Sequence, residues 1–173
     1  MSETTSILAI DPGYEHSAYV WLDMRRGFPP RLFGVDDTDN ERLARQLSGF
    51  AELPTTGEGC HRPEILVVEQ VQSYSNYIGR ETLDTWFWAG RFVQAWGGRW
   101  APLCRPTIKA LLCGSAKAKD CDVRAALIDL YGPTKREAVG LKASPGPLYG
   151  LKSHLWSALA VGVAYLMQQR QAG

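Results

Sequence analysis

The first strong pattern in the chain is an apolar run at 7–10 that ends in Asp11 and is broken at once by Pro12 and Gly13. Such a run, bounded by a turn signal, predicts a strand that is buried on both faces. The turn leaves the Asp11 carboxylate at the rim of the sheet, where open α/β sheets place their sites. The bland alternative is a turn in which the aspartate caps its own loop.

Two further strands are predicted over 17–24 and 31–36, and their short connections suggest an antiparallel meander of three strands. A helix then begins at Asp39 or Asn40, either of which can cap it, and ends before Pro54. Its apolar positions at helical spacing are Leu43, Leu47 and Phe50.

A second apolar run closed by a carboxylate lies at 64–69 and ends in Glu69. Because this strand is reached through a helix, we expect it to lie parallel to the first strand and beside it. Asp11 and Glu69 then meet at one edge of the sheet. Two carboxylates there repel each other unless a cation joins them, which suggests a divalent metal. The alternative partner for Glu69 is a nearby arginine.

The pattern over 81–96 predicts a long helix with apolar residues on more than one face. One face carries Leu83, Phe87, Gly90 and Val93, and another carries Trp88, Phe92 and Ala95. Such a helix is either enclosed in a core or shared with a second subunit. The small size of the chain favours the shared interface, and hence a homodimer.

The C-terminal half is predicted as a strand at 99–105, a helix at 108–112 capped by Thr107, a helix at 122–131, a loop at 133–150 and a final helix at 151–169. The core stripe of the final helix consists of Leu155, Leu159, Val163 and Leu166. His154 and Ser157 are three residues apart near its start and so share a face.

Composition narrows the class of protein. A length of 173 residues allows one domain with a substantial core, and 45% of the residues are hydrophobic. The chain has neither an apolar run of membrane-spanning length nor a signal-peptide pattern, so a soluble, cytoplasmic protein is expected. The four cysteines form no CxxC pair, which favours free thiols over a zinc site.

Charge is unevenly distributed although the net charge is only +1. Residues 1–98 contain 8 Lys and Arg against 14 Asp and Glu, whereas residues 99–152 contain 10 against 4. A basic half beside a carboxylate site suits a protein that holds a polyanion at a metal. Lys117 and Lys119 lie in a turn between two short helices, as in a backbone-phosphate contact.

Four segments together carry a resemblance to a known family. They are Leu8–Gly13, Val67–Val71, the basic stretch formed by 105–109 with 114–119, and 154–160. Their order over nearly the whole chain resembles the RNase H-like fold and, within it, the RuvC-type Holliday junction resolvases. The small size and the tryptophan-rich middle helix are most similar to bacteriophage or prophage members.

The resemblance implies an α/β fold with a mixed central sheet flanked by helices, in a single domain over 1–173. It implies a crossover junction endodeoxyribonuclease that cuts four-way DNA junctions as a homodimer, in a bacterial cell or a phage-infected host. Two Mg²⁺ or Mn²⁺ ions per site are expected, with Asp11 between them and Glu69 and His154 as outer ligands. The fourth catalytic position, usually an aspartate, falls on Ser157, which either orders a metal-bound water or faces the core.

The DNA-contacting residues also depart from the family pattern. The family places an aromatic wedge just after the Glu-Gln-Val motif, where this chain has Gln72. Tyr74 or Tyr77 is therefore expected to take that part. The cationic residues expected to contact DNA are Arg80, Lys109, Lys117 and Lys119.

Two other functions stay open at the level of sequence. One is a junction-binding module that has lost catalysis with the missing fourth acid. The other is a nuclease for single strands, or one directed by RNA, on the same fold. The presence of both Asp11 and Glu69, which are costly to hold together without metal, weighs against the inactive module.

Overall fold

A five-stranded mixed sheet lies at the centre of the computed structural model, which describes residues 6–25, 27–51, 63–72 and 78–172. The strands are β1 (Ser6–Asp11), β2 (His16–Asp23), β3 (Arg31–Asp39), β4 (Ile65–Gln70) and β5 (Trp100–Cys104), in the order β3-β2-β1-β4-β5. The first three form the predicted antiparallel meander. β4 pairs with β1 in parallel, as expected, and β5 pairs in parallel with β4.

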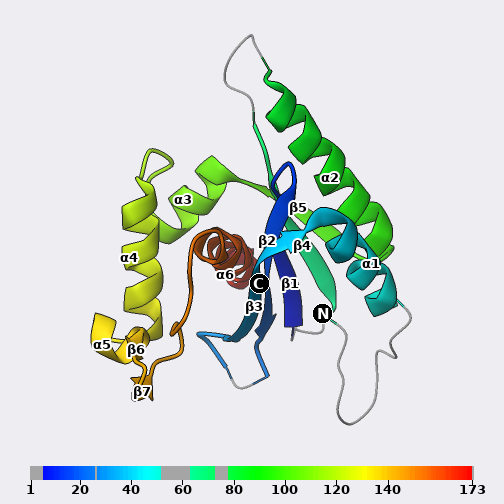
Figure 1. Ribbon diagram of the computed structural model, residues 1–173. Coiled ribbons are helices and arrows are strands. Elements are labelled where there is room, and N and C mark those ends of the chain that lie inside the picture. The colour runs from blue at the N-terminus through cyan, green and yellow to red at the C-terminus, as the bar shows by residue number, and fades with distance from the viewer. Residues whose placement is uncertain (1–5, 26, 52–62, 73–77, 173) are drawn as a thin grey trace.

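Helices cover both faces of the sheet (Figure 1). α1 (Asn40–Ala51) and α2 (Arg80–Trp96) pack together on one face. α6 (Leu155–Ala172) crosses the other face, and α3 (Arg105–Cys113) and α4 (Asp120–Tyr131) pack against it. None of the helices in the described ranges is both long enough and apolar enough to span a membrane.

The alternation of side chains along β1 divides the core between these two layers. Ile7 and Ala9 point into the core beneath α6, while Leu8 and Ile10 point into the core beneath α1 and α2. All four are fully buried, which explains why the first strand reads as a continuous apolar run. On α6, Gly162 lies so close to Leu22 and Ala9 that a Cβ at this position would require a neighbouring side chain to shift.

The start of α3 and the segment at 133–150 differ from the expected elements. α3 begins at Arg105, with Cys104 as its N-cap residue and proline in its first turn, so Thr107 lies inside the helix and is not its cap. The predicted loop at 133–150 contains α5 (Lys135–Ala138) and a hairpin of β6 (Gly140–Leu141) and β7 (Ser144–Pro145). The Thr134 side chain caps α5 by accepting a hydrogen bond from the backbone N–H of Glu137.

The final helix begins at Leu155 and not at 151. Gly150 and Ser153 both have positive φ angles, of 81° and 40°, and this backbone cannot belong to a right-handed helix. The predicted core stripe along α6 is nonetheless buried in full. His154 therefore precedes the helix, and Ser157 lies in its first turn.

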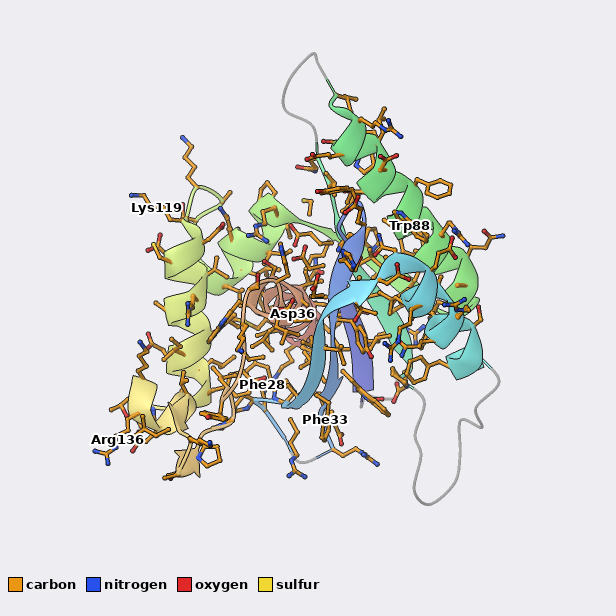
Figure 2. All side chains as sticks on the ribbon, viewed as in Figure 1. Phe28, Phe33, Asp36, Trp88, Lys119 and Arg136 are labelled. Carbon is orange, nitrogen blue, oxygen red and sulfur yellow. The ribbon has the colours of Figure 1, made fainter. Side chains whose placement is uncertain are left out.

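The two apolar faces of α2 have different environments. Phe92 and Trp96 are buried in the core of their own chain, and Trp88, labelled in Figure 2, is partly buried with its ring 5.9 Å from that of Phe92. Phe92 is thus not available to a second subunit, contrary to expectation. The outer side chains of α2 are instead Leu83, Trp86 and Phe87, which are 49%, 39% and 60% exposed.

Candidate active site

Asp11 and Glu69 are brought together by the parallel pairing of β1 and β4. Ile10 is opposite Val68 in the register, so the next residue on each strand is a carboxylate at the same edge of the sheet. Both side chains are largely covered, at 16% and 11% exposed. The juxtaposition predicted from the two strand-carboxylate motifs is confirmed.

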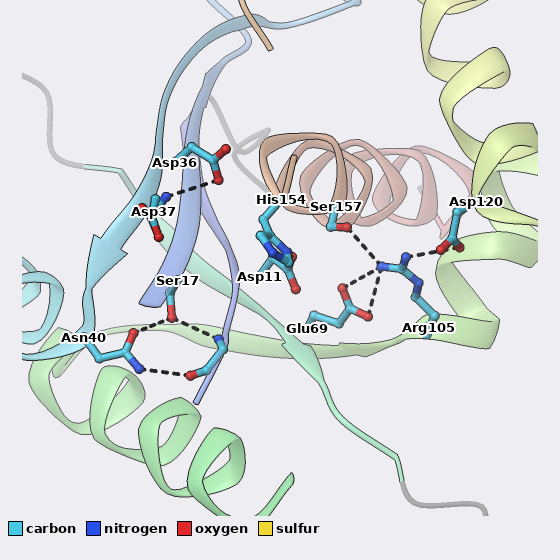
Figure 3. Close-up of polar contacts among 11 residues, drawn as sticks. Asp11, Ser17, Asp36, Asp37, Asn40, Glu69, Arg105, Asp120, His154 and Ser157 are labelled. Carbon is cyan, nitrogen blue, oxygen red and sulfur yellow. Dashed lines mark hydrogen bonds and ion pairs between the residues drawn. The ribbon is translucent and has the colours of Figure 1, made fainter. Parts of the chain in front are cut away.

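The turn after Asp11 is held by a network of three hydrogen bonds (Figure 3). The Gly13 N–H donates to Ser17 Oγ at 3.1 Å, and Ser17 donates to Asn40 Oδ1 at 2.7 Å. The Asn40 amide returns a bond to the Gly13 carbonyl at 2.9 Å. Only glycine fits at position 13, because a Cβ there would collide with the carbonyl oxygen of His16. Buried Ser17 and Asn40 thus hold the turn that follows Asp11, a role that is not apparent from the sequence.

His154 lies against Asp11, with 3.2 Å between Nδ1 and Oδ2. The histidine precedes α6, and its carbonyl accepts the N–H of Ala158 at 3.0 Å, which anchors it to the helix. Burial raises the pKa of the Asp11 carboxyl, while the charges of His154 and Arg105 act in the opposite direction. The structure thus joins the first and third of the predicted site residues.

Glu69 faces Arg105, which is the first residue of α3 (Figure 3). Its two carboxylate oxygens lie 3.3 and 3.2 Å from Nη1 of the guanidinium. The same nitrogen is 3.3 Å from the Ser157 hydroxyl, so Ser157 faces the site and not the core. Burial, followed by the charge of Asp11, raises the pKa of Glu69 to about 7 even though Arg105 acts to lower it.

Arg105 is held on its other side by Asp120, at the start of α4. The Asp120 carboxylate accepts from Nη2 of Arg105 at 3.2 Å and from Nζ of Lys109 at 3.1 Å. In the sequence, Arg105 belongs only to a basic segment, and Asp120 has no distinguishing pattern around it. A signal for Arg105 was present, because it directly follows the parallel strand β5 and so lies at the same edge as Asp11 and Glu69.

A cavity of about 650 Å³ opens beside these residues, between α3, α4 and α6. Asp11, Arg105, Asp120, His154 and Ser157 all line it. Its far wall carries Arg124, whose guanidinium stacks over the ring of Trp156 at 4.5 Å. The polar cluster is thus accessible from solvent through a groove that also exposes two arginines.

The donor set fits a hard cation only in part. Within the described ranges, no three His, Cys, Asp or Glu side chains meet closely enough to form a metal cluster. Burial raises the pKa of both carboxyls, so the ionised pair is costly in the protein alone and would be stabilised by a bound cation. His154 adds an imidazole donor beside Asp11. Oxygen and imidazole donors suit Mg²⁺ and Mn²⁺. Cys104, Cys113 and Cys121 are free thiols, and Cys60 lies outside the described residues.

The predicted DNA-contacting residues lie around this site at different distances from it. Lys109 is in the cluster through Asp120, whereas Lys117 and Lys119 are exposed on the turn between α3 and α4, where Lys119 extends into solvent (Figure 2). Arg80 is exposed at the start of α2 and lies 3.6 Å from Asp84. Tyr74 and Tyr77 lie outside the described residues.

The known proteins to which this chain is similar, in sequence or in structure, include Holliday junction resolvases. No family model matches the chain. In sequence it is similar to the crossover junction endodeoxyribonuclease RuvC of Saccharopolyspora erythraea, at 27% identity over 173 positions that cover 96% of this chain and 79% of the relative.

The structural comparison agrees with this. Thermus thermophilus RuvC matches with a TM-score of 0.61 at 18% identity, and 96% of each chain is covered. The same protein in complex with a Holliday junction substrate matches with a TM-score of 0.62 at 18% identity, covering 97% of this chain and 96% of that one. The fowlpox virus Holliday junction resolvase matches with a TM-score of 0.52 at 14% identity, covering 95% and 99%. The predicted fold, a mixed sheet of RNase H-like topology flanked by helices, is confirmed.

Proposed function

We propose that this chain, a homologue of RuvC, is a metal-dependent endonuclease that cuts branched DNA, with four-way junctions as its main substrate. The observation that carries the proposal is the convergence of Asp11, Glu69 and His154 at one edge of the sheet. It occurs in a chain that is similar to a crossover junction endodeoxyribonuclease over nearly its whole length. The fold alone would not select this activity.

Asp11, Glu69 and His154 are the residues proposed to hold Mg²⁺ or Mn²⁺. When bound, such an ion lowers the pKa of a coordinated water and polarises the phosphate that is attacked. The sequence predicts two ions per site, with Asp11 between them. The three side chains provide protein ligands for one ion, and a second would depend largely on oxygens of the substrate.

The remaining residues of the site position these donors. The Ser17 and Asn40 network holds the turn that directs Asp11, and His154 restrains the same carboxylate. Arg105 holds Glu69 in the metal-free protein. Each contact reduces the number of side-chain conformations available to the donors, which favours the geometry needed for reaction.

The DNA is proposed to run from the groove across the basic turn between α3 and α4. Lys117 and Lys119 are exposed there and suit phosphate contacts, as does the exposed Arg80 at the start of α2. Tyr74 and Tyr77 stay candidates for the wedge at the branch point. The comparisons support a junction substrate only through the Thermus thermophilus protein, which was solved with a Holliday junction.

A homodimer is part of the proposal because paired incision of a junction needs two sites. The exposed Leu83, Trp86 and Phe87 of α2 supply an apolar surface of the kind found at the centre of interfaces. The further expectations, a single nuclease domain over 1–173, a cytoplasmic location and a phage or prophage origin, belong to the same proposal.

The deciding experiment is incubation of the purified protein with an end-labelled four-way junction in EDTA, Mg²⁺ or Mn²⁺, followed by mapping of any nicks. We expect paired nicks that require metal and disappear in Asp11→Asn, with junction affinity equal or higher because negative charge near the phosphate is removed. Asp129→Asn, which alters an exposed carboxylate on α4, is the matched control and should cut normally.

Three outcomes would contradict the proposal. Tight junction binding without nicks under every metal condition would identify a binding module instead. Faster cutting of single strands or of an RNA–DNA hybrid than of the junction would identify another nuclease class. Loss of both binding and cutting in Asp11→Asn would mean that Asp11 has a structural role.

A further inference from the structure

Arg105 occupies the centre of the cluster in a way that the metal ligands alone do not explain. The parallel strands β1, β4 and β5 end side by side. Asp11 is at the end of β1, Glu69 is near the end of β4, and Arg105 directly follows β5. Nη1 of the guanidinium lies within 3.3 Å of both Glu69 oxygens and of the Ser157 hydroxyl. A permanent positive charge thus lies among the groups expected to bind metal, because arginine keeps its proton in proteins.

The residue at position 157 makes this arrangement possible. An aspartate there, the residue usual in RuvC-type resolvases, would add a third carboxylate to the two that already pair with Arg105, those of Glu69 and Asp120. Ser157 is neutral, so its hydroxyl accepts one hydrogen bond from Nη1 and adds no negative charge to the cluster. The cluster holds two cations, Arg105 and Lys109, against three carboxylates, those of Asp11, Glu69 and Asp120. This leaves one net negative charge, which favours one divalent ion over two.

Arg105 is also positioned to reach a substrate. Its side chain is 34% exposed and lines the same cavity as Asp11 and His154. Asp120 anchors Nη2 and is itself held by Lys109, so the guanidinium plane has a fixed orientation. A planar guanidinium binds phosphate oxygens with good geometry. When a phosphate group of the DNA enters the cavity, Nη1 can donate its hydrogen bond to a phosphate oxygen instead of to Glu69. The Glu69 carboxylate is then free to ligate the ion.

We infer that Arg105 is a catalytic residue that replaces a second metal ion, while Asp11, Glu69 and His154 hold a single divalent ion. In the reaction, water forms a new bond to phosphorus and gives its proton to solvent. The bond from phosphorus to the 3′ oxygen breaks, and that oxygen keeps the electron pair and is protonated by solvent. Arg105 donates hydrogen bonds to the phosphate oxygens throughout and keeps its own proton. The inference rests on the proposed function, because it names how the same site handles the same substrate.

The first measurement counts ions and does not depend on activity. Mn²⁺ bound per protomer is determined by electron paramagnetic resonance of the free ion, with an ordinary four-way junction at low temperature and for times too short for cutting. The Mn²⁺ bound by the junction alone is measured separately and subtracted. We expect one Mn²⁺ in the wild type. We expect two in the double variant Arg105→Ala with Ser157→Asp, which restores the acidic fourth position. A thermal melt of each variant verifies that it is folded.

The second measurement is single-turnover nicking of the ordinary junction. Arg105→Ala should slow nicking about 100-fold, the usual cost of removing one group that stabilises transition-state charge, and Arg105→Lys should recover about tenfold of that loss. In the double variant, the rate should depend on the square of Mn²⁺ concentration below saturation, against the first power in the wild type. Arg170→Ala is the matched control, because Arg170 stacks on Phe28 outside the site and its loss should change neither readout.

Failure of this inference can be told apart from failure of the proposed function. A wild type that cuts junctions and binds two Mn²⁺ overturns the inference alone, as does an Arg105→Ala variant that is folded and cuts within threefold of the wild-type rate. A wild type that neither binds Mn²⁺ nor cuts any branched substrate overturns the proposed function, and the inference with it.

Discussion

Replacement of Glu69 by glutamine should stabilise the metal-free protein at alkaline pH. The pKa of this carboxyl is raised from 4.5 to about 7, first by burial and then by Asp11, against the opposing effect of Arg105. Between those two values the folded state binds more protons than the unfolded state. The free energy of unfolding therefore falls as pH rises from about 4.5 to 7. At every pH above 7, the folded protein has lost the full amount of stability that ionisation of the buried Glu69 costs.

The size of the effect follows from the same numbers. A pKa raised from 4.5 to about 7 corresponds to a cost of about 3 kcal/mol at pH 8 and about 1 kcal/mol at pH 5. Glu69→Gln removes the charge, and its amide oxygen can still accept a bond from Arg105, which also keeps Asp120. Because a neutral acceptor binds the guanidinium less strongly, we expect a gain of about 1–3 kcal/mol at pH 8.

The assay is urea unfolding in EDTA at pH 5 and pH 8 for the wild type, Glu69→Gln and a control, Glu41→Gln. Glu41 is a half-exposed carboxylate that pairs with Arg91 outside the site, so its replacement should have a small and similar effect at both pH values. The raised pKa of Asp11 adds a slope of the same sign to the wild type and to Glu41→Gln, and it cancels between those two. In Glu69→Gln the repulsion between the two carboxylates is gone, so the Asp11 slope is smaller and adds to the expected gain at pH 8. A Glu69→Gln variant no more stable than the wild type at pH 8, or equally stabilised at both pH values, would refute the reasoning.

Two further predictions concern assembly and junction recognition. Phe87→Asp on the outer face of α2 should shift the predicted dimer to a monomer in light scattering. Phe92→Ala should instead reduce the stability of each chain by about 3 kcal/mol, because Phe92 is buried in the core. A wild type that is monomeric at micromolar concentration contradicts the dimer. Alanine at both Tyr74 and Tyr77 should weaken junction binding more than duplex binding in gel shifts, by about 1–3 kcal/mol per stacked base. Equal losses on the two DNAs would mean that the tyrosines do not stack at the branch point.

The meeting of Asp11 and Glu69 could be predicted because it depends on local signals and one topological rule. Each carboxylate closes a β-branched or apolar run, and a strand reached through a helix lies parallel to its neighbour. The contact of His154 with Asp11 could be expected only through the family resemblance. The geometry of this contact depends on where α6 begins, and the apolar pattern predicts the wrong start. The pattern begins at residue 151, but the positive φ angles at Gly150 and Ser153 are incompatible with a helix, so α6 begins at Leu155.

The hydrogen-bond network behind the turn could not be predicted for a different reason. Ser17 and Asn40 are polar residues at a strand start and a helix start, positions at which serine and asparagine are common for local reasons. Their contact spans 23 residues and exists only because β2 returns beside β1 and α1 begins next to the turn. Asp39, and not Asn40, accepts the capping bond from the Arg42 N–H at 2.9 Å, which leaves the Asn40 side chain for Gly13.

From the sequence, an arginine partner for Glu69 and a metal at Asp11 and Glu69 are alternatives. In the structure they are compatible, because Arg105 and both carboxylates lie in one cluster. Arg105 lowers the pKa of Glu69 but does not bring it back to its ordinary value, because burial and the charge of Asp11 oppose the ionised form. A divalent ion beside the two carboxylates would therefore stabilise that ionised form further. At about 4 Å, and with the effective dielectric constant of about 20 that suits partly buried groups, a guanidinium and a divalent ion repel by about 8 kcal/mol. One ion can share the site with Arg105 because two carboxylates offset that repulsion. A second ion would need a carboxylate at position 157, where this chain has a serine. The neutral Ser157 and the cationic Arg105 therefore both favour a site with one ion.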